Sequence, residues 1–570
     1  MPHLATFLTY REHMNDVQPF RREKLREEAV RKSAFVAQKP TEEELKLAQK
    51  RAEVFKRTID SLDEYSQTKT EDVESVTQTF LGETTAFLTT MGVGLGKIFQ
   101  STDMGENLTQ KIAKKMGSLK KAAPHVIPGA SGVLFAIVAS LPVLKAMMTI
   151  DVQTPRIARF ETLKGELSHT NDFAILTDEQ IEQVENEAKN VSIPKPKTIE
   201  KSLISSLNIL GQTKSYLDIV AKRAIYKKDR EDFEQTKTKK AQAAKNLTFT
   251  DEEIKKAKET QEITQRLVHK MDLESQDYIE RVFKILDVTS MCLFGFGVVG
   301  YWGVEKLMKM FKVSDGAFKK FFPFASALAG VIILNSKVAE YRNNAIRIAR
   351  HKEMNKLLQD PTNFLKTPDV KVETQNIKIE QSQKKNLFAF LKEFAKDRDD
   401  YEIYTKTKMQ EDKKFKLAAR NIKLTDEQKA EAKANQMNLF KAINIVDKNK
   451  EKYEEKYEII VTLLSTPMGL VATTLGNAFG YALHSLKKAP KSQIPLYSII
   501  GTVVGLVPAI AIELYTTIQT RNAARVGYMQ SQKDLKDYKQ FLDYSKVKLE
   551  DNPFLKLSFK NDNQTFAAFK

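Results

Sequence analysis

The chain has 570 residues, of which 42% are hydrophobic and 29% are charged, and its mean hydropathy is -0.40. This length exceeds a single small core, and the low numbers of glycine (22) and proline (17) disfavour an all-β fold with many turns. A single cysteine, Cys292, excludes an internal disulfide framework and a cysteine-based zinc site. The net charge of +18 indicates attraction to anionic surfaces, whether lipid headgroups, nucleic acid or acidic proteins.

Residues 1–80 are predicted to form an N-terminal helical arm without a signal peptide, because no apolar stretch there is long enough for one. Thr41 and Glu44 have the spacing of a capping box, which predicts a helix start. Apolar residues then recur in steps of three and four, which is typical of a narrow seam that packs against a partner helix. The seam residues proposed as an arm interface are Ala48, Phe55, Ile59 and Leu62.

Residues 81–170 are predicted to form a first apolar hairpin and a basic exit helix. The apolar runs are 86–99 and 126–144, and the exit segment reads Arg-Ile-Ala-Arg from Arg156 to Arg159. Small residues at four-residue steps would let helix backbones approach closely in lipid. These predicted packing residues are Gly92, Gly96, Gly132, Ala136 and Ser140.

Residues 171–281 are predicted to form a second arm, with an extra capped helix that starts at Thr177. A second capping box, Thr250 with Glu253, begins the main helix of this arm. Its seam residues are Ala257, Val268 and Met271.

Residues 282–358 are predicted to form the second hairpin and its exit helix, with apolar runs at 288–304 and 321–334. Ser326 and Gly330 are its predicted packing residues. The exit again reads Arg-Ile-Ala-Arg, from Arg347 to Arg350.

Residues 359–456 are predicted to form a third arm, 457–535 a third hairpin with its exit helix, and 536–570 a C-terminal tail. Thr425 and Gln428 supply the capping box, and Arg525 to Tyr528 form the exit segment. The seam residues of this arm are Ala432, Leu439, Ile443 and Val446. The apolar runs are 459–483 and 494–512, with the packing residues Gly476, Gly480, Gly501 and Gly505.

These landmarks occur three times in the same order, which indicates an internal three-fold repeat. The period is uneven, since Thr41 and Thr250 are 209 residues apart whereas Thr250 and Thr425 are 175 apart. We place the additional residues of the longer first period around residues 172–224, the segment with the extra helix that starts at Thr177.

The six apolar runs lead us to predict an all-α, integral membrane protein with up to six membrane helices in three pairs and with cytoplasmic arms. If the hairpins instead dip into one leaflet and return, all basic segments, the exits included, face anionic lipid headgroups. Two alternatives remain open: hairpins that dip into one leaflet and return, and a soluble bundle with glycine-rich buried hairpins.

We find no catalytic, cofactor-binding or metal-binding pattern, and we expect no enzyme activity. The stretch Gly295 to Gly300 matches G-x-G-x-x-G, but it lies within an apolar run without the strand and helix of a dinucleotide site, and helix packing explains it better. The ionisable candidates for a transport role are Lys145, Glu340 and Glu513, at the ends of apolar runs. Nucleic-acid binding is supported by net charge alone.

Three repeats of two helices resemble the plan of the mitochondrial carriers, but the proline motif that ends each first helix of that family is missing here. No fold, substrate or residue role is therefore transferred. Our first functional hypothesis is a membrane-anchored scaffold whose arms bind partner proteins or other copies. The alternative is a six-helix transporter or channel, and the third is a soluble helical assembly protein.

Overall fold

The computed structural model describes residues 2–117, 123–165, 167–193, 209–243, 249–311, 338, 340–370, 386–455 and 494–542. In this part of the chain the regular structure is entirely helical, which confirms the all-α prediction. The long helices are α1 (Pro2–Ala37), α2 (Glu42–Gln100), α4 (Ala123–Lys164), α6 (Ile209–Ala243), α8 (Ser275–Met310) and α14 (Ile494–Asp534). The shorter helices are α3 (Asp103–Met116), α5 (Asp178–Ala188), α7 (Asp251–Val268), α10 (Leu387–Lys406), α11 (Lys408–Ala419) and α12 (Asp426–Lys450). A further helix covers 340–359.

The arm and the first apolar run of a repeat form one continuous helical rod. In the first repeat this rod is α2, and in the second it is α7, the π-helical turn η5 (His269–Glu274) and α8 in direct succession. The predicted boundaries at 80/81 and 281/282 therefore fall inside helices. In the first and third repeats the second apolar run continues into its exit segment in the same way, as α4 and α14.

The capping boxes start the helices where the sequence predicts them. Thr177, Thr250 and Thr425 each accept a hydrogen bond from the backbone amide three residues on, and the Gln or Glu at that position accepts one from the Thr amide. Thr41 and Glu44 make the same reciprocal pair. Each box satisfies two amide groups that a helix start leaves without partners.

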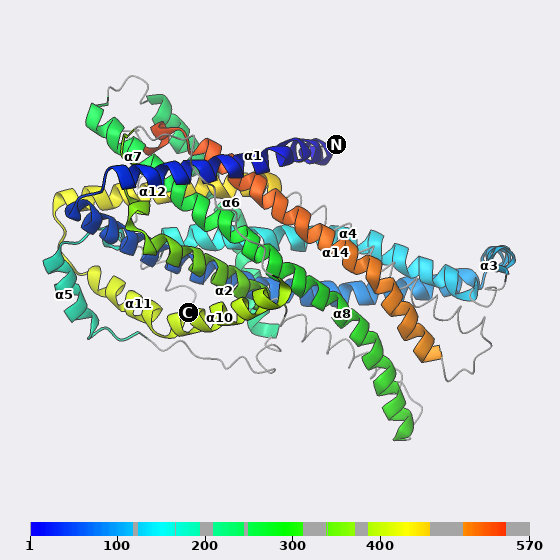
Figure 1. Ribbon diagram of the computed structural model, residues 1–570. Coiled ribbons are helices and arrows are strands. Elements are labelled where there is room, and N and C mark those ends of the chain that lie inside the picture. The colour runs from blue at the N-terminus through cyan, green and yellow to red at the C-terminus, as the bar shows by residue number, and fades with distance from the viewer. Residues whose placement is uncertain are drawn as a thin grey trace.

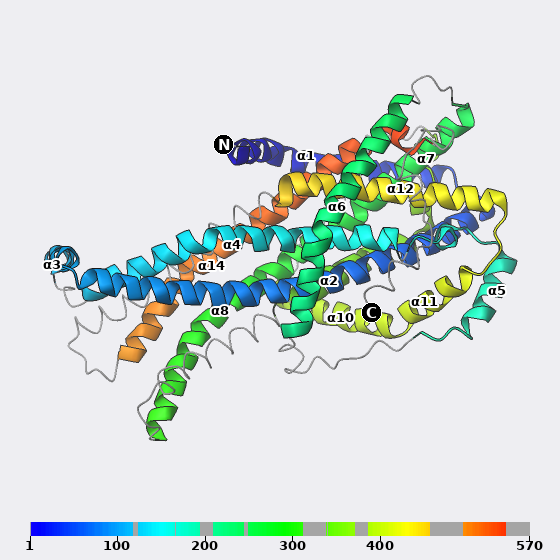
Figure 2. The same cartoon turned by 180° about the vertical axis from the view of Figure 1, so that it is seen from behind.

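The arms and exits assemble into a bundle, which we call the head, and several helices extend beyond it on one side (Figures 1 and 2). The helices α2 and α4 lie side by side, and α3 lies at their far end (Figure 1). The end of α8 and the beginning of α14 also project from the head (Figure 1).

A short 3-10 turn follows each exit helix and contacts the arm of another repeat. The turn η6 (Pro361–Phe364) contacts α2, η9 (Tyr538–Phe541) contacts α7, and η2 (Thr170–Phe173) contacts α12. Each repeat thus docks on the arm of the preceding one, and the first docks on the third. This cyclic order closes the three repeats into a ring.

Within the described residues, no helix combines the length and the apolar character needed to cross a membrane. The prediction of an integral membrane protein with up to six membrane helices and cytoplasmic arms is therefore wrong for this part of the chain. The apolar runs that prompted it continue into helices rich in charged residues, such as α2 and α8.

Candidate functional site

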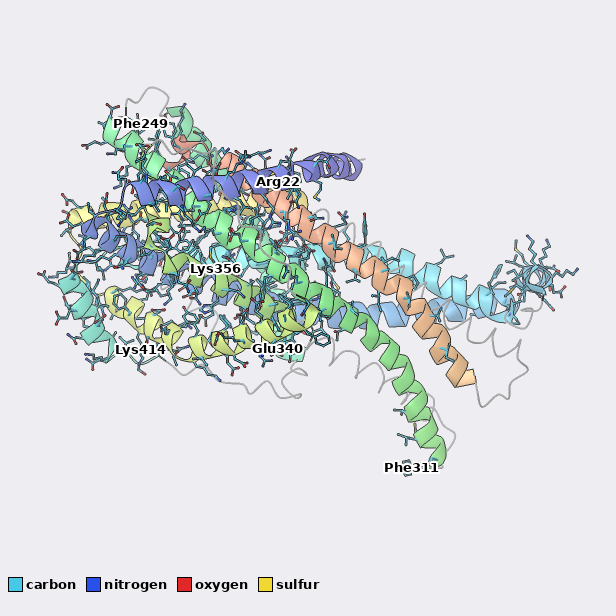
Figure 3. All side chains as sticks on the ribbon, viewed as in Figure 1. Arg22, Phe249, Phe311, Glu340, Lys356 and Lys414 are labelled. Atoms are coloured by element: carbon cyan, nitrogen blue, oxygen red, sulfur yellow. The ribbon has the colours of Figure 1, made fainter. Side chains whose placement is uncertain are left out.

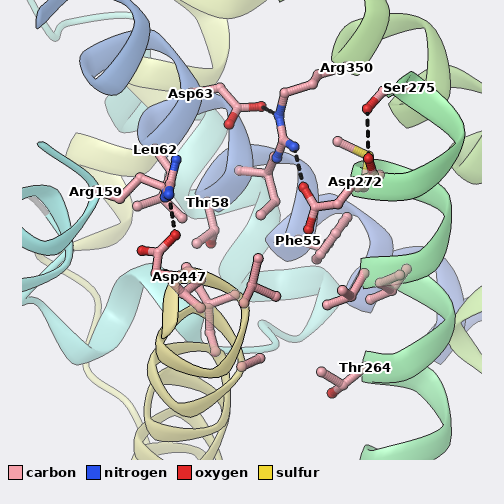
Figure 4. Close-up of a pocket in the computed structure, with 18 of the residues that line it drawn as sticks. Phe55, Thr58, Leu62, Asp63, Arg159, Thr264, Asp272, Ser275, Arg350 and Asp447 are labelled. Carbon is pink, nitrogen blue, oxygen red and sulfur yellow. Dashed lines mark hydrogen bonds and ion pairs between the residues drawn. The ribbon is translucent and has the colours of Figure 1, made fainter. Parts of the chain in front are cut away.

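A cavity of about 420 Å³ lies in the head, with walls from all three repeats (Figure 4). Its lining combines the apolar seams of the arms with a dense set of charged side chains. The cations are Arg51, Arg156, Arg159, Lys256, Arg342, Arg350, Lys450 and Arg521, and the carboxylates are Asp63, Glu74, Asp151, Glu259, Asp272, Glu431, Asp447 and Glu454. The two sets are equal in number, so the lining carries no formal net charge.

Three carboxylates of this cavity occupy the same position in the three repeats. Asp63, Asp272 and Asp447 each stand 22 residues after the capping threonine of their arm. Each directly follows the last seam residue, so the helical turn that buries the seam also brings the carboxylate to the cavity. Equivalent positions of the three repeats thus supply three aspartates to the cavity, and we call them the aspartate ring.

The exit helices bring arginines to these aspartates, and the pairs with Asp63 and Asp447 cross a repeat boundary. Arg350 donates from Nε to Asp63 and from Nη1 to Asp272, both at 2.5 Å, and Arg159 pairs with Asp447 (Figure 4). Burial by itself would lower the pKa of Arg350, but the two carboxylates outweigh burial and raise that pKa above its usual value. These guanidinium groups therefore stay charged and fix the distance between arms.

The third repeat departs from this pattern at two linked positions. Tyr528 stands where the other exits have Arg159 and Arg350, and Lys450 stands where the other arms have Ser66 and Ser275. The ammonium group of Lys450 lies 4.9 Å from the centre of the Tyr528 ring. A cation is thus lost from the third exit and gained on the third arm, which keeps the inner charges balanced.

A second layer of ion pairs follows the same cyclic order about two helical turns further along the arms. Arg347 lies 3.6 Å from Glu71, and Arg525 lies 2.6 Å from Glu280. Both glutamates stand 30 residues after their capping threonine, and both arginines open their exit segment. Repetition of the pair at equivalent positions shows that two of the repeat interfaces are built alike.

The chemistry available in the cavity is mainly electrostatic pairing. Among the described residues, no group of three or more His, Cys, Asp or Glu side chains is placed to hold a metal ion. The carboxylates of the aspartate ring face arginine or lysine, which hold them in place. Three buried polar atoms at the lining, Nε of Arg342, Nε of Arg521 and Oε1 of Gln67, lack a hydrogen-bond partner within the described structure.

The predicted arm seams are buried inside the molecule. Their buried members are Ala48, Ile59, Leu62, Ala257, Met271, Ala432 and Val446, and their partly buried members are Phe55, Val268, Leu439 and Ile443. Several of them line the cavity, where Phe55 meets Phe364 of the second repeat with ring centres 5.7 Å apart. The helix partners of the seam thus come from the same chain, so other molecules must contact other surfaces.

The basic exit segments do not face outward as the headgroup interpretation required. Arg156 and Arg525 are only 3% and 7% exposed, and Arg350 is held between two arms. Arg-rich exits pair with arm carboxylates because a buried guanidinium needs charged partners.

The predicted packing and transport residues are described only in part. Gly96 is buried in α2, whereas Lys145 is exposed on α4 and Glu340 is half-buried at the start of helix 340–359 (Figure 3). Neither Lys145 nor Glu340 lines the cavity. The remaining side chains lie outside the described residues: Gly92, Gly132, Ala136, Ser140, Ser326, Gly330, Gly476, Gly480, Gly501, Gly505 and Glu513.

The aspartate ring was missed although its signal is present in the sequence. Comparison of the repeats identifies the seam positions 7, 18 and 21 residues after each threonine, and the shared carboxylate stands at the next position. The compensating change at Lys450 and Tyr528 needed the structure, because the two residues are 78 positions apart.

Comparison with known proteins returned no matching family model, no matching curated protein and no matching solved structure.

Proposed function

We propose that this protein is a non-enzymatic helical scaffold, in which the closed three-repeat head holds the projecting helices in a fixed arrangement for contacts with other molecules. The observation that carries the proposal is the cyclic set of ion pairs between repeats. A scaffold requires rigid attachment of its extended parts, and buried guanidinium–carboxylate pairs specify such an arrangement because breaking one leaves an uncompensated charge.

Exposed apolar side chains on the projecting helices support the same proposal. Ile98, Met104 and Phe311 are 66%, 73% and 72% exposed. Phe311 lies at the far end of α8, away from the head (Figure 3). Clusters of exposed apolar residues commonly mark interaction surfaces.

A transporter is less well supported than a scaffold. The described residues contain no helix able to cross a membrane, and most of the cavity cations pair with carboxylates of the same lining.

Distance measurements between the projecting helices test the scaffold. Spin labels at Ile98→Cys and Phe311→Cys, in a Cys292→Ser background, should give one narrow distance distribution in the intact chain. Arg350→Met should broaden that distribution, because it frees two arms from their common cation. Lys46→Met, which removes an exposed pair with Glu42, is the control and should leave it unchanged. A broad distribution in the parent protein would contradict a rigid scaffold.

A further inference from the structure

The far ends of the projecting helices expose apolar side chains that no other part of the described chain covers. On α2 and α3 these residues are Leu95, Ile98, Phe99, Met104 and Leu108. On the ends of α8 and α14 they are Leu307, Met310, Phe311, Ile500, Val504 and Val507. We call these three clusters the projecting ends. Isolated exposed apolar residues are normal, but several on successive turns at the ends of three extended helices call for an apolar partner.

The helix α3 is held across the tip of the first projecting end. Thr102 caps its first turn by accepting a hydrogen bond from the amide of Gly105. Gly105 itself touches the end of α2, since a Cβ atom there would lie 2.1 Å from the carbonyl oxygen of Phe99. This close approach requires glycine and fixes α3 against α2.

One face of α3 combines apolar and basic side chains. Met104, Leu108, Lys111 and Lys115 follow one another in steps of four, three and four, so they lie along one stripe of the helix. All four are exposed, as is the neighbouring Lys114. Within the described chain, no ion pair joins these three lysines to a carboxylate. A helix that carries lysines beside exposed apolar side chains is suited to lie at a lipid surface.

The charge on α3 selects among possible partners. A second copy would bring like-charged lysines together, which disfavours self-association through this face. A nucleic acid would engage the lysines but would leave Met104 and Leu108 in water. An anionic lipid layer satisfies both groups, because its headgroups attract lysine and its acyl region accepts apolar side chains.

We infer that the projecting ends bind the surface of an anionic lipid layer, with α3 lying at headgroup level. Met104 and Leu108 enter the apolar edge of that layer, and Lys111, Lys114 and Lys115 contact lipid phosphates. The contact is peripheral, on one face of the lipid layer. This inference rests on the proposed scaffold and names the partner to which its extended parts attach.

Vesicle flotation with the purified full-length chain tests the inference. The vesicles are phosphatidylcholine alone, or phosphatidylcholine with roughly a third phosphatidylserine. We expect binding to the anionic vesicles that weakens as salt is raised. Lys111→Gln/Lys114→Gln/Lys115→Gln should lower that affinity on the order of 100-fold, because each lysine near such a surface contributes about a five-fold factor.

Two further variants separate the apolar contribution from net charge. Met104→Ser/Leu108→Ser should also weaken binding, at unchanged net charge. The matched control, Lys214→Gln/Lys227→Gln/Lys228→Gln, removes three exposed lysines from α6 and should bind like the parent. An equal loss in the control would overturn the inference, because binding would then follow total charge alone.

The same protein preparation also tests whether this face binds a second copy of the chain. Light scattering of the parent protein without vesicles reports self-association, and a dimer that Met104→Ser/Leu108→Ser dissociates would assign this face to a second copy and overturn the inference. Absence of flotation with anionic vesicles would overturn it as well. The spin-label distances are measured without lipid, so failure of lipid binding leaves the scaffold itself separately testable.

Discussion

At the scale of single residues, the inner charges of the head behave as one balanced set. Arg350 donates hydrogen bonds to both Asp63 and Asp272. Asp272 has no arginine from the third exit, because Tyr528 stands at that position. Lys450 supplies the missing positive charge from the third arm, close to Glu454 and the Tyr528 ring. Its burial lowers the pKa of Lys450, and the nearby carboxylate of Glu454 opposes that change.

This balance predicts strong coupling between the two positions where the third repeat differs. Tyr528→Arg alone adds a buried cation, and Lys450→Ser alone removes one, so each should lower the free energy of unfolding by about 3 kcal/mol. The double variant restores the arrangement of the first two repeats, and it should lower the free energy of unfolding by less than about 1 kcal/mol. Denaturant titration measures the free energy of unfolding of the two single variants and the double variant. Additive losses would show that the two changes do not compensate each other.

A second prediction concerns Asp60 on α2, which accepts a hydrogen bond from the hydroxyl of Tyr404. Burial raises the pKa of Asp60 to about 7, against the lowering effects of Tyr404 and Lys56. Between about pH 4 and pH 7 the folded chain keeps a proton that the unfolded chain has lost, so stability falls as pH rises through this window.

Asp60→Asn removes that titration and keeps an acceptor for Tyr404. Its stability relative to the parent should therefore increase from about pH 4 to pH 7 and stay constant above. We expect the free energy of unfolding of Asp60→Asn to rise by roughly 2 kcal/mol relative to the parent over this range. The full shift in the pKa of Asp60 would correspond to roughly 4 kcal/mol, but solvent screening reduces the effect because the side chain is partly exposed. Glu274, whose pKa is also raised to about 7 by burial and by Glu353, titrates in both proteins and cancels in the comparison. A pH-independent difference would contradict this account.

At the scale of helices, the local signals in the sequence were sufficient to predict where the arm helices begin and which face of each is buried. The four capping boxes and the three- and four-residue steps of the seam depend on residues within one or two turns, and the structure has helices starting at each box. The partners of the seam could not be predicted, because they depend on how distant segments meet. Exit arginines such as Arg156 look alike in a sequence whether they face headgroups or buried carboxylates.

The 3-10 turn after each exit is the element that locks one repeat onto the previous arm. Phe364 of η6 is 1% exposed and packs edge-on against Phe55 of α2. Phe364→Ala should therefore lower the free energy of unfolding by about 3–5 kcal/mol. Phe311→Ala, at an exposed phenylalanine of the same size, is the control and should change it by less than about 0.5 kcal/mol. Thermal or denaturant unfolding followed by circular dichroism measures both, and equal effects would contradict the role of the turn.

At the scale of the whole molecule, the repeat makes a closed ring instead of an open stack. The third arm meets the first exit through Arg159 with Asp447 and through the rings of Phe160 and Phe440, whose centres are 5.5 Å apart. Asn171 adds hydrogen bonds to the carbonyl groups of Ala419 and Ile422. These contacts join segments far apart in the chain and leave no repeat without neighbours on both sides.

The triplication was predictable because its landmarks keep one order along the chain, whereas ring closure was not. An open array of the same repeats would have the same sequence pattern, since closure depends on the angle between neighbouring repeats. The apolar runs led to a wrong prediction of membrane helices because their sequence, too, fits more than one arrangement. Length and composition alone do not distinguish a membrane helix from one that projects beyond a charged head.

The most direct test of ring closure is a double-mutant cycle on Arg159 and Asp447, which lie 288 residues apart. The variants are Arg159→Met, Asp447→Asn and both together, and the free energy of unfolding is measured for each. A closed ring predicts that the two losses are coupled by about 1–3 kcal/mol. Arg159→Met combined with Glu71→Gln, which lies at a different repeat interface, is the control and should give additive losses. Additive losses for Arg159 and Asp447 would show that the first and third repeats do not meet, and would contradict the closed ring.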